Sequence, residues 1–175
     1  MNIYNQDKTK LVNSVFSKVH KNYDLMNDLM SLGVHRLWKR NLITWMNPQP
    51  ENKIIDVASG TGDLAKMISQ KNKNRNIFCC VEPNQGMFDT GKKKLRSLTN
   101  IAWYLNSAEK LPFQENTFDF YTISYGIRNV TDINQCLKEA YRVLKPGGRF
   151  FCLEFSKVEN EILKLLYQQY SKLIP

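Results

Sequence analysis

The sequence predicts an α/β fold: a mostly parallel, twisted sheet with helices on both faces. Two observations carry this prediction. From Lys53 onward, short apolar runs alternate with segments of helical periodicity. A turn with two glycines, Gly60 and Gly62, directly follows the first apolar run. Such sheets bind ligands beyond the carboxyl ends of their strands. With 175 residues, the chain is long enough for one domain with a sizeable core.

Each element is expected from its own residue pattern. Residues 9–46 carry apolar positions spaced three and four apart, which indicates helix with one buried face. The stretch NPQPEN at 47–52 interrupts this pattern with two prolines. The later pattern predicts strands at 53–58, 76–82, 101–106, 117–125 and 149–155, and helices at 63–71, 84–97, 132–144 and 158–173.

The domain is expected to have two parts. Residues 1–48 form an N-terminal helical segment that we expect to act as a lid or substrate segment, and residues 49–175 form the ligand-binding core. Lys145-Pro146-Gly147-Gly148 is expected to be a helix stop followed by a turn. Because the last helix runs almost to Pro175, we expect the last strands of the domain to be missing.

Composition excludes several classes of protein. Apolar residues make up 42% of the chain, and no window approaches 18 consecutive apolar residues, so no segment is expected to span a membrane. Residues 1–10 fit neither a secretory signal nor a transit peptide, which favours a cytoplasmic location. The four cysteines lack metal-ligand spacing, so we expect reduced, largely buried thiols and no metal.

The net charge of +9 raises the question of an anionic partner. Part of the excess lies in basic runs at 70–75 and 91–96, which we interpret as solvated helix faces. No nucleic-acid-binding motif accompanies them, so no nucleic acid is expected. A peripheral contact at the inner face of the membrane stays open, because polybasic surfaces attract anionic lipid.

The glycine turn is the first candidate site. Gly60, Gly62 and Ala65 stand in the register G-x-G-x-x-A, which fits a nucleotide-binding turn between strand and helix. Glu82 follows at the end of the next strand, where it is expected to accept hydrogen bonds from both ribose hydroxyls of an adenosine. The pattern alone also fits a tight turn with no ligand.

Two acids near the turn favour one nucleoside ligand over another. Asp56 precedes Gly60 by four residues and Asp63 directly follows Gly62. A carboxylate repels the diphosphate of NAD but suits the sulfonium and ammonium groups of S-adenosylmethionine. Asp63 also fits a simple first-turn acid of a helix.

The motifs together resemble the class I S-adenosylmethionine-dependent methyltransferases. The acid-then-GxG turn, the acid of the second strand, the "LPF…FD" segment and "LKPGG" stand in order at sensible distances. Longer stretches are similar to the ubiquinone/menaquinone biosynthesis C-methyltransferase family, above all "GIRNVTD" (126–132) and "LEFSK" (153–157). The resemblance implies a Rossmann-like class I methyltransferase fold, with S-adenosylmethionine as methyl donor and no metal.

The resemblance also implies a donor site, formed by Thr61, Glu82, Ser107, Ala108 and Ser124, in addition to Asp56, Gly60 and Gly62. Two positions depart from the family pattern. The family usually has glycine at Ser59 and aspartate at Glu82. Glutamate serves the same role in related methyltransferases, so donor binding is expected to be retained.

The implied reaction is C-methylation of a polyprenylated quinol ring, either a benzoquinol or a naphthoquinol. The ring carbon must lie in line with the sulfonium methyl, and a proton must leave. The resemblance implies a proton relay of Arg128 and Asn129. Because the pKa of arginine exceeds 12, we expect Arg128 to stabilise the phenolate, or else to pair with a nearby carboxylate. Tyr23, His35 and Tyr125 are expected to face the substrate, with His35 either a base or a structural residue.

Two other functions stay open at this point. One is an NAD-dependent oxidoreductase, and the other is a truncated or degenerate methyltransferase-like protein that only binds partners. Beyond the quinol, the expected partners are the membrane surface or a quinone-biosynthesis assembly, and a homodimer is left open.

Overall fold

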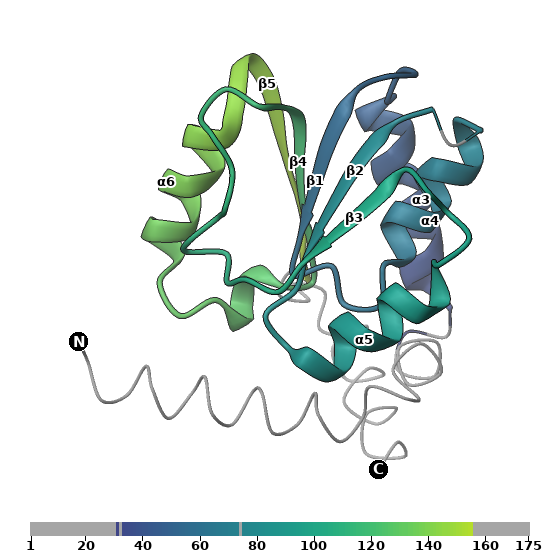
Figure 1. Ribbon diagram of the computed structural model, residues 1–175, viewed down its shortest axis with the longest axis horizontal. Coiled ribbons are helices and arrows are strands. Elements are labelled where there is room, and N and C mark those ends of the chain that lie inside the picture. The colour runs from purple at the N-terminus through teal and green to yellow at the C-terminus, as the bar shows by residue number, and fades with distance from the viewer. Residues whose placement is uncertain (1–30, 32, 74, 156–175) are drawn as a thin grey trace, which may run out of the picture.

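Parallel strands form the central sheet in the order β3-β2-β1-β4-β5 (Figure 1). The computed structural model describes residues 31, 33–73 and 75–155. Its strands are β1 (Lys53–Val57), β2 (Ile77–Val81), β3 (Ile101–Tyr104), β4 (Phe118–Ser124) and β5 (Leu144–Leu153). Its helices are α3 (Val34–Met46), α4 (Asp63–Lys71), α5 (Gln85–Lys94) and α6 (Ile133–Val143), with a 3-10 turn, η2 (Ile127–Asn129). The strand order reverses between β1 and β4, so the topological switch point lies beside the glycine turn.

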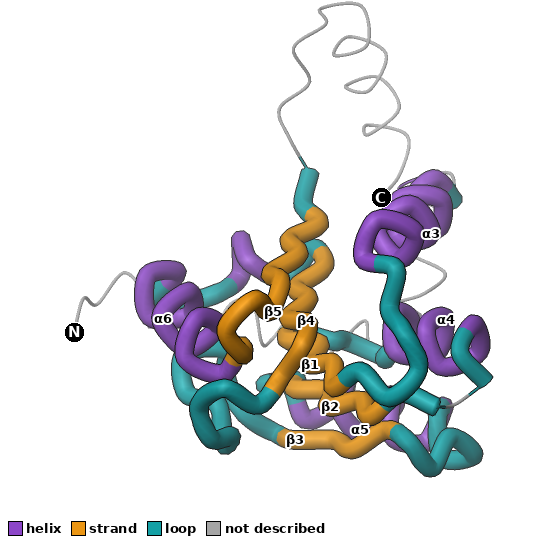
Figure 2. Tube along the Cα trace, turned by 90° about the horizontal axis from the view of Figure 1, so that it is seen from above, coloured by secondary structure: helices purple, strands orange, loops and turns teal. Residues whose placement is uncertain are grey.

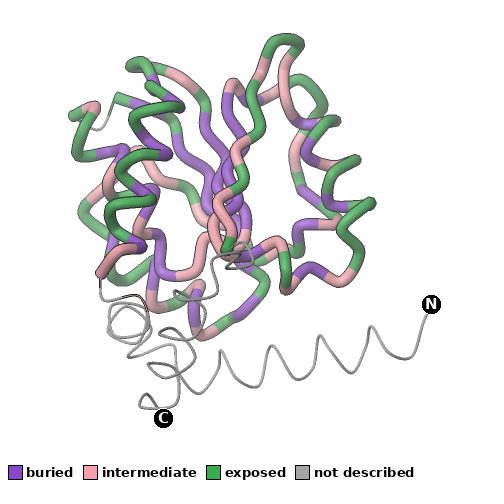
Figure 3. Tube along the Cα trace, turned by 180° about the vertical axis from the view of Figure 1, so that it is seen from behind, coloured by how far each residue is buried: buried purple, intermediate pink, exposed green. Residues whose placement is uncertain are grey.

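Two hydrophobic clusters lie on opposite faces of this sheet. On one face, α3 and α4 pack through Leu42, Ile43 and Ile68 against Ile54. On the other face, α6 packs against the sheet through its buried residues, Cys136, Ala140 and Val143. Figure 2 shows these helices on either side of the strands, and Figure 3 shows the buried residues concentrated along the strands. The predicted α/β class, with helices on both faces, is confirmed.

Helix α3 belongs to this covering layer. Its buried residues include Leu42 and Met46, and the Met46 carbonyl accepts a hydrogen bond of 2.7 Å from Arg149 of β5. The described part of the predicted 1–48 segment is therefore helix packed on the sheet. Residues 1–30, on which most of the lid prediction falls, lie outside the described residues, as does the predicted helix at 158–173.

Three details differ from the predictions. Strand β5 begins at Leu144, directly after α6, whereas we expected a turn at 145–148 and a strand from 149. Leu144 pairs with Phe118 and Arg149 with Phe120, so the residues between them bulge from the ladder, helped by a positive φ of 79° at Gly147. The basic run at 70–75 is mostly loop, because α4 ends at Lys71. Of the four free thiols, Cys152 is exposed and the other three are buried.

Asp56 is buried under the helices that cover the sheet, rather than exposed at the carboxyl ends of the strands. Its side chain is only 2% exposed, and one carboxylate oxygen accepts a hydrogen bond of 2.7 Å from the hydroxyl of Thr122 on β4. Alternation along β1 puts it on the same face as Ile54, under α3 and α4. Burial raises the pKa of Asp56 to about 7, although Thr122 and Lys39 act in the opposite direction.

A glycine lets α5 approach the edge of the sheet. Gly91 is buried in α5, and a Cβ there would lie 2.2 Å from Cη2 of Trp103 on β3. An indole ring packed between helix and sheet has little freedom to move. The close approach of α5 to β3 therefore depends on the missing side chain.

Gly91→Ala is expected to lower the free energy of unfolding by about 1–2 kcal/mol, because overpacking outweighs the usual helix preference for alanine. Urea denaturation followed by circular dichroism measures this change. In a Trp103→Leu background, which removes the clash, the same substitution is expected to stabilise by up to about 1 kcal/mol. A stabilising effect in the wild-type background would contradict the packing argument.

Asp56→Asn is expected to stabilise the protein increasingly as the pH rises. The folded-state pKa exceeds the ordinary value of 3.8, so the folded state binds the proton more tightly and ionisation costs stability between pH 3.8 and about 7. Asparagine removes this cost. The gain over wild type should grow by about 3 kcal/mol between about pH 5 and about pH 8, since one pKa unit corresponds to about 1.4 kcal/mol.

Urea denaturation at the two pH values measures the difference. Glu115→Gln, which neutralises an exposed carboxylate, is the control and should show no comparable pH dependence. A stability difference between Asp56→Asn and wild type that does not change with pH would show that Asp56 has an ordinary pKa.

Candidate active site at the carboxyl ends of the strands

The predicted donor residues lie together at the carboxyl ends of the parallel strands. The glycine turn follows β1, Glu82 follows β2, Ser107 and Ala108 follow β3, and Ser124 ends β4. Because all the strands are parallel, these positions lie at the same edge. The fold therefore brings together residues that are far apart in the sequence. Asp56 is the exception, since it lies buried beneath the turn, and its contact with a ligand stays a prediction.

The glycine turn needs glycine at two positions. Gly60 and Gly62 have positive φ angles of 57° and 80°, and a Cβ at Gly62 would lie 2.7 Å from Leu95. The turn closes through a hydrogen bond of 2.9 Å from the Gly62 N–H to the Ser59 carbonyl. Ser59 is not among the residues with positive φ, so serine fits where the family usually has glycine.

Glu82 joins the turn after β1 to the turn after β2. One carboxylate oxygen accepts a hydrogen bond of 2.8 Å from the Gly60 N–H, and the other accepts one of 2.9 Å from the Asn84 N–H. Burial raises the pKa of Glu82, and these two N–H groups partly offset the effect. Each oxygen retains a second lone pair for a ligand hydroxyl. Asn84 also caps α5 through its side chain, which accepts from the Met87 N–H.

Asp63 is neutralised by two lysines. Lys39 of α3 and Lys94 of α5 lie 3.3 and 2.7 Å from its carboxylate oxygens, and Lys94 also donates to the hydroxyl of Thr61. Burial alone would raise the pKa of Asp63, but the lysines outweigh it and lower the pKa to about 2. With Asp56 buried, neither acid presents an unpaired carboxylate at the turn. The charge argument against a diphosphate, which we drew from these two acids, is therefore not supported by their placement.

The loop after β3 carries Ser107, which is exposed, and Ala108, which is buried. The next residue, Glu109, ties this loop to the start of α6. Its carboxylate accepts hydrogen bonds from the N–H groups of Thr131 and Asp132, at 2.8 and 3.2 Å. The sequence motifs around 107 and 131 therefore meet in space.

Helix α6 holds the same loop at a second place. Arg142 donates to the carbonyls of Phe113 and Leu111, at 2.6 and 3.1 Å, and forms an ion pair with Glu139. The Glu139 carboxylate in turn accepts from the Leu111 N–H at 2.7 Å. Sequence reasoning missed this clamp, although the "LPF…FD" segment was part of the methyltransferase pattern. It fixes the backbone that presents Ser107 and Ala108.

The end of β4 is strained and closely packed. Tyr125 has a positive φ of 57°, and its N–H donates to the Leu153 carbonyl at 2.7 Å. A Cβ at the next residue, Gly126, would lie 2.5 Å from Cβ of Ala58. Burial, followed by the charge of Glu154, raises the pKa of the Tyr125 phenol to about 12, while Arg128 acts to lower it. Tyr125 is therefore neutral near pH 7 and can donate a hydrogen bond.

Arg128 pairs with a carboxylate, which was the structural alternative in the sequence analysis. Its guanidinium contacts Glu154 at the end of β5 and lies 5.3 Å from the ring centroid of Phe155. Asn129 lies in η2, where its N–H donates to the Gly126 carbonyl at 2.9 Å. Sequence reasoning assigned no role to Glu154 or Phe155, even though both belong to the stretch "LEFSK".

The residues predicted to face the substrate are only partly described. Tyr23 lies outside the described residues. His35 is buried in α3, and its Nδ1 lies 2.7 Å from the hydroxyl of Ser31. In the described residues, no group of three or more His, Cys, Asp or Glu side chains is arranged to hold a metal ion.

Comparisons with known proteins agree with this geometry. Among curated proteins, the chain is 52% identical over 170 residues to the ubiquinone/menaquinone biosynthesis C-methyltransferase UbiE of Rickettsia prowazekii, covering 94% of this chain and 68% of that protein. It is 44% identical to a mitochondrial 2-methoxy-6-polyprenyl-1,4-benzoquinol methylase of Dictyostelium discoideum, covering 95% of this chain and 63% of that protein.

Solved structures share the fold at low sequence identity. The [4+2]-cyclase SpnF superposes with a TM-score of 0.74 at 19% identity, over 87% of this chain and 62% of that one. A putative S-adenosylmethionine-dependent methyltransferase from Methanococcus maripaludis gives 0.69 at 18%, over 87% and 69%. The model of the ubiE/COQ5 methyltransferase family matches residues 3–175. The chain therefore belongs to the ubiE/COQ5 methyltransferase family.

Proposed function

We propose that the chain transfers a methyl group from S-adenosylmethionine to a ring carbon of a polyprenylated quinol in menaquinone or ubiquinone biosynthesis. The family match over residues 3–175 carries this proposal. The names of the relatives from Rickettsia and Dictyostelium support the quinol as substrate class. They do not decide between a naphthoquinol and a benzoquinol.

The donor fits the edge of the sheet through Glu82. The second lone pairs of its carboxylate are suited to the two ribose hydroxyls, and the glycine turn leaves room for a close approach of the ligand. Thr61, Ser107, Ala108 and Ser124 complete the proposed donor site. Since Asp63 is paired with two lysines, local charge does not separate this donor from NAD, and the family match favours the methyl donor.

The chemistry requires an electron-rich ring held against the donor. The quinol oxygen loses its proton, the ring carbon forms a bond to the methyl carbon, and the bonding electrons return to sulfur as the C–S bond breaks. The ring carbon then loses its own proton and aromaticity returns. The protein must therefore position the ring in line with the methyl group and accept a proton.

Glu82→Gln is expected to weaken S-adenosylhomocysteine binding by at least about tenfold, because the amide NH2 group then faces the N–H of Gly60 or that of Asn84. Calorimetry of the wild-type chain should show binding of S-adenosylmethionine and S-adenosylhomocysteine but not of NAD. Glu115→Gln, an exposed carboxylate remote from the turn, is the matched control and should bind as wild type.

The calorimetric outcomes separate the three functions. Binding of NAD alone would favour the oxidoreductase, and binding of none of the three compounds would favour a protein that only binds partners. Methyl transfer to demethylmenaquinol and to a 2-methoxy-6-prenyl-1,4-benzoquinol then identifies the ring. Transfer to neither ring by a chain that binds the donor would overturn the proposed substrate class.

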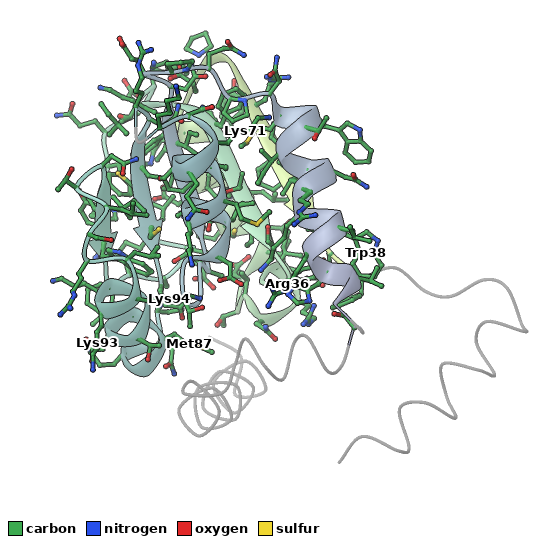
Figure 4. All side chains as sticks on the ribbon, turned by 90° about the vertical axis from the view of Figure 1, so that its right-hand side faces the viewer. Arg36, Trp38, Lys71, Met87, Lys93 and Lys94 are labelled. Carbon is green, nitrogen blue, oxygen red and sulfur yellow. The ribbon has the colours of Figure 1, made fainter. Side chains whose placement is uncertain are left out.

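We further propose that the chain meets its lipid-dissolved substrate at an anionic membrane surface. In the described part of the chain, no helix has the length and apolar character needed to cross a bilayer. Helix α3 exposes Leu37, Trp38 and Trp45, and also Arg36 and Arg40, and it contains no acidic residue. Figure 4 shows Arg36 and Trp38 on different sides of its first turns. Tryptophan and arginine on one exposed helix suit the lipid headgroup region.

Trp45→Ala is expected to reduce, severalfold, the fraction of protein retained by vesicles of phosphatidylcholine and phosphatidylglycerol in a flotation assay. Trp45 is 74% exposed, so stability should change by no more than about 0.5 kcal/mol. Tyr141→Ala removes an aromatic ring that is 86% exposed on α6, across the sheet, and should leave retention unchanged. Salt should release the wild-type chain. Equal retention of the Trp45 variant and wild type would exclude α3 as the contact.

A further inference from the structure

Unpartnered polar atoms cluster where β4 and β5 end. In the described part of the chain, four buried side-chain N or O atoms have no hydrogen-bond partner, and three of them are Ser124 Oγ, Tyr125 OH and Glu154 Oε2. All three belong to the carboxyl ends of two neighbouring strands. Buried polar atoms are rarely left without partners. Their concentration at one place therefore indicates a polar ligand with more than one hydrogen-bonding group.

Aromatic side chains border these atoms. The ring of Phe155 is 52% exposed and stacks on the ring of Tyr125, with centroids 4.7 Å apart. Trp38 of α3 meets Phe155 edge to face at 5.8 Å. An exposed aromatic surface next to buried hydroxyl groups suits a ligand that is itself a hydroxylated aromatic ring.

The contacts of Glu154 leave one oxygen available. Arg128 and the N–H of Phe155 both contact Oε1, the latter at 3.0 Å. Oε2 receives neither contact and is buried beside them. A carboxylate oxygen is a hydrogen-bond acceptor, so Oε2, which has no partner, can accept from a ligand hydroxyl. The arrangement presents a fixed acceptor whose direction is set by Arg128.

We propose that Glu154 is a catalytic residue that accepts the quinol hydroxyl proton at Oε2, with Arg128 as the positioning residue that holds the carboxylate. This inference rests on the proposed function. As the proton passes from the quinol oxygen to Oε2, the electron pair of the O–H bond moves into the ring. The ring carbon attacks the methyl group, and the C–S pair leaves with sulfur. Ser124 and Tyr125 hydrogen-bond the ring oxygens. After transfer the ring carbon loses its own proton to water, the C–H electron pair restores the aromatic ring, and the ring oxygen takes back the proton held by Glu154.

Glu154→Gln tests the proposal because it keeps the shape of the side chain and the acceptor facing Arg128 but cannot take up a proton. The wild-type chain should methylate a short-chain prenyl quinol, and the variant should lose about 100-fold or more in kcat, the usual loss when a general base is removed. S-adenosylhomocysteine affinity should stay within about twofold of wild type. Glu115→Gln should retain full activity.

A second substrate distinguishes proton acceptance from a structural role. A chlorinated quinol has a more acidic hydroxyl and depends less on a protein base, so the ratio of wild-type to variant kcat should shrink. Retention of kcat within about threefold would overturn the proposal, as would an unchanged ratio with the chlorinated quinol. Loss of S-adenosylhomocysteine binding or of cooperative unfolding in the variant would assign Glu154 a structural role instead. A wild-type chain that binds the donor but methylates no quinol would overturn the proposed function itself.

Discussion

The carboxylate of Glu82 links the two turns from which the candidate site is built. It accepts one backbone N–H from the turn after β1 and one from the turn after β2, so the end of β2 holds both turns. A buried carboxylate with two N–H partners is worth more than a neutral hydrogen bond, and leaving it unpaired would be costly. The positive φ angles of Gly60 and Gly62 cost little because both residues are glycine, and the contact with Glu82 fixes the loop in this conformation. The remaining donor residues are then arranged around these two fixed turns.

Much of the fold could be predicted because it depends on local pattern. The run KIIDV is apolar enough to be a buried strand, and the glycines after it require a turn. The bulge at the start of β5 could not be predicted, since Gly147 looks the same in a helix-ending turn and in an irregular strand. Only pairing with β4 decides between them. The clamp of Glu139 and Arg142 on the loop after β3 was missed for the same reason, because its partners are far apart in sequence.

The electrostatics of the site were harder to predict than its position. Sequence placed Asp56 and Asp63 beside the turn and counted both as free negative charge. The structure buries the first beneath the sheet edge and pairs the second with Lys39 and Lys94, which come from two different helices. Charge at a site depends on which side chains fold back onto it, and no spacing rule contains that information. The family match, rather than charge, therefore carries the assignment of the donor.

The donor residues and the polar groups at the ends of β4 and β5 tell us different things about function. The cyclase SpnF shares this fold at 19% identity, so the architecture of strands and turns does not by itself define a reaction. A glycine turn and an acid after the second strand suit nucleosides in general. What distinguishes chemistry is the set of groups that the neighbouring strands present to the second reactant. Here that set is a neutral phenol, a hydroxyl and one unpartnered carboxylate oxygen beside an exposed phenylalanine, and an aromatic diol offers both the ring and the hydroxyl groups that these residues can contact.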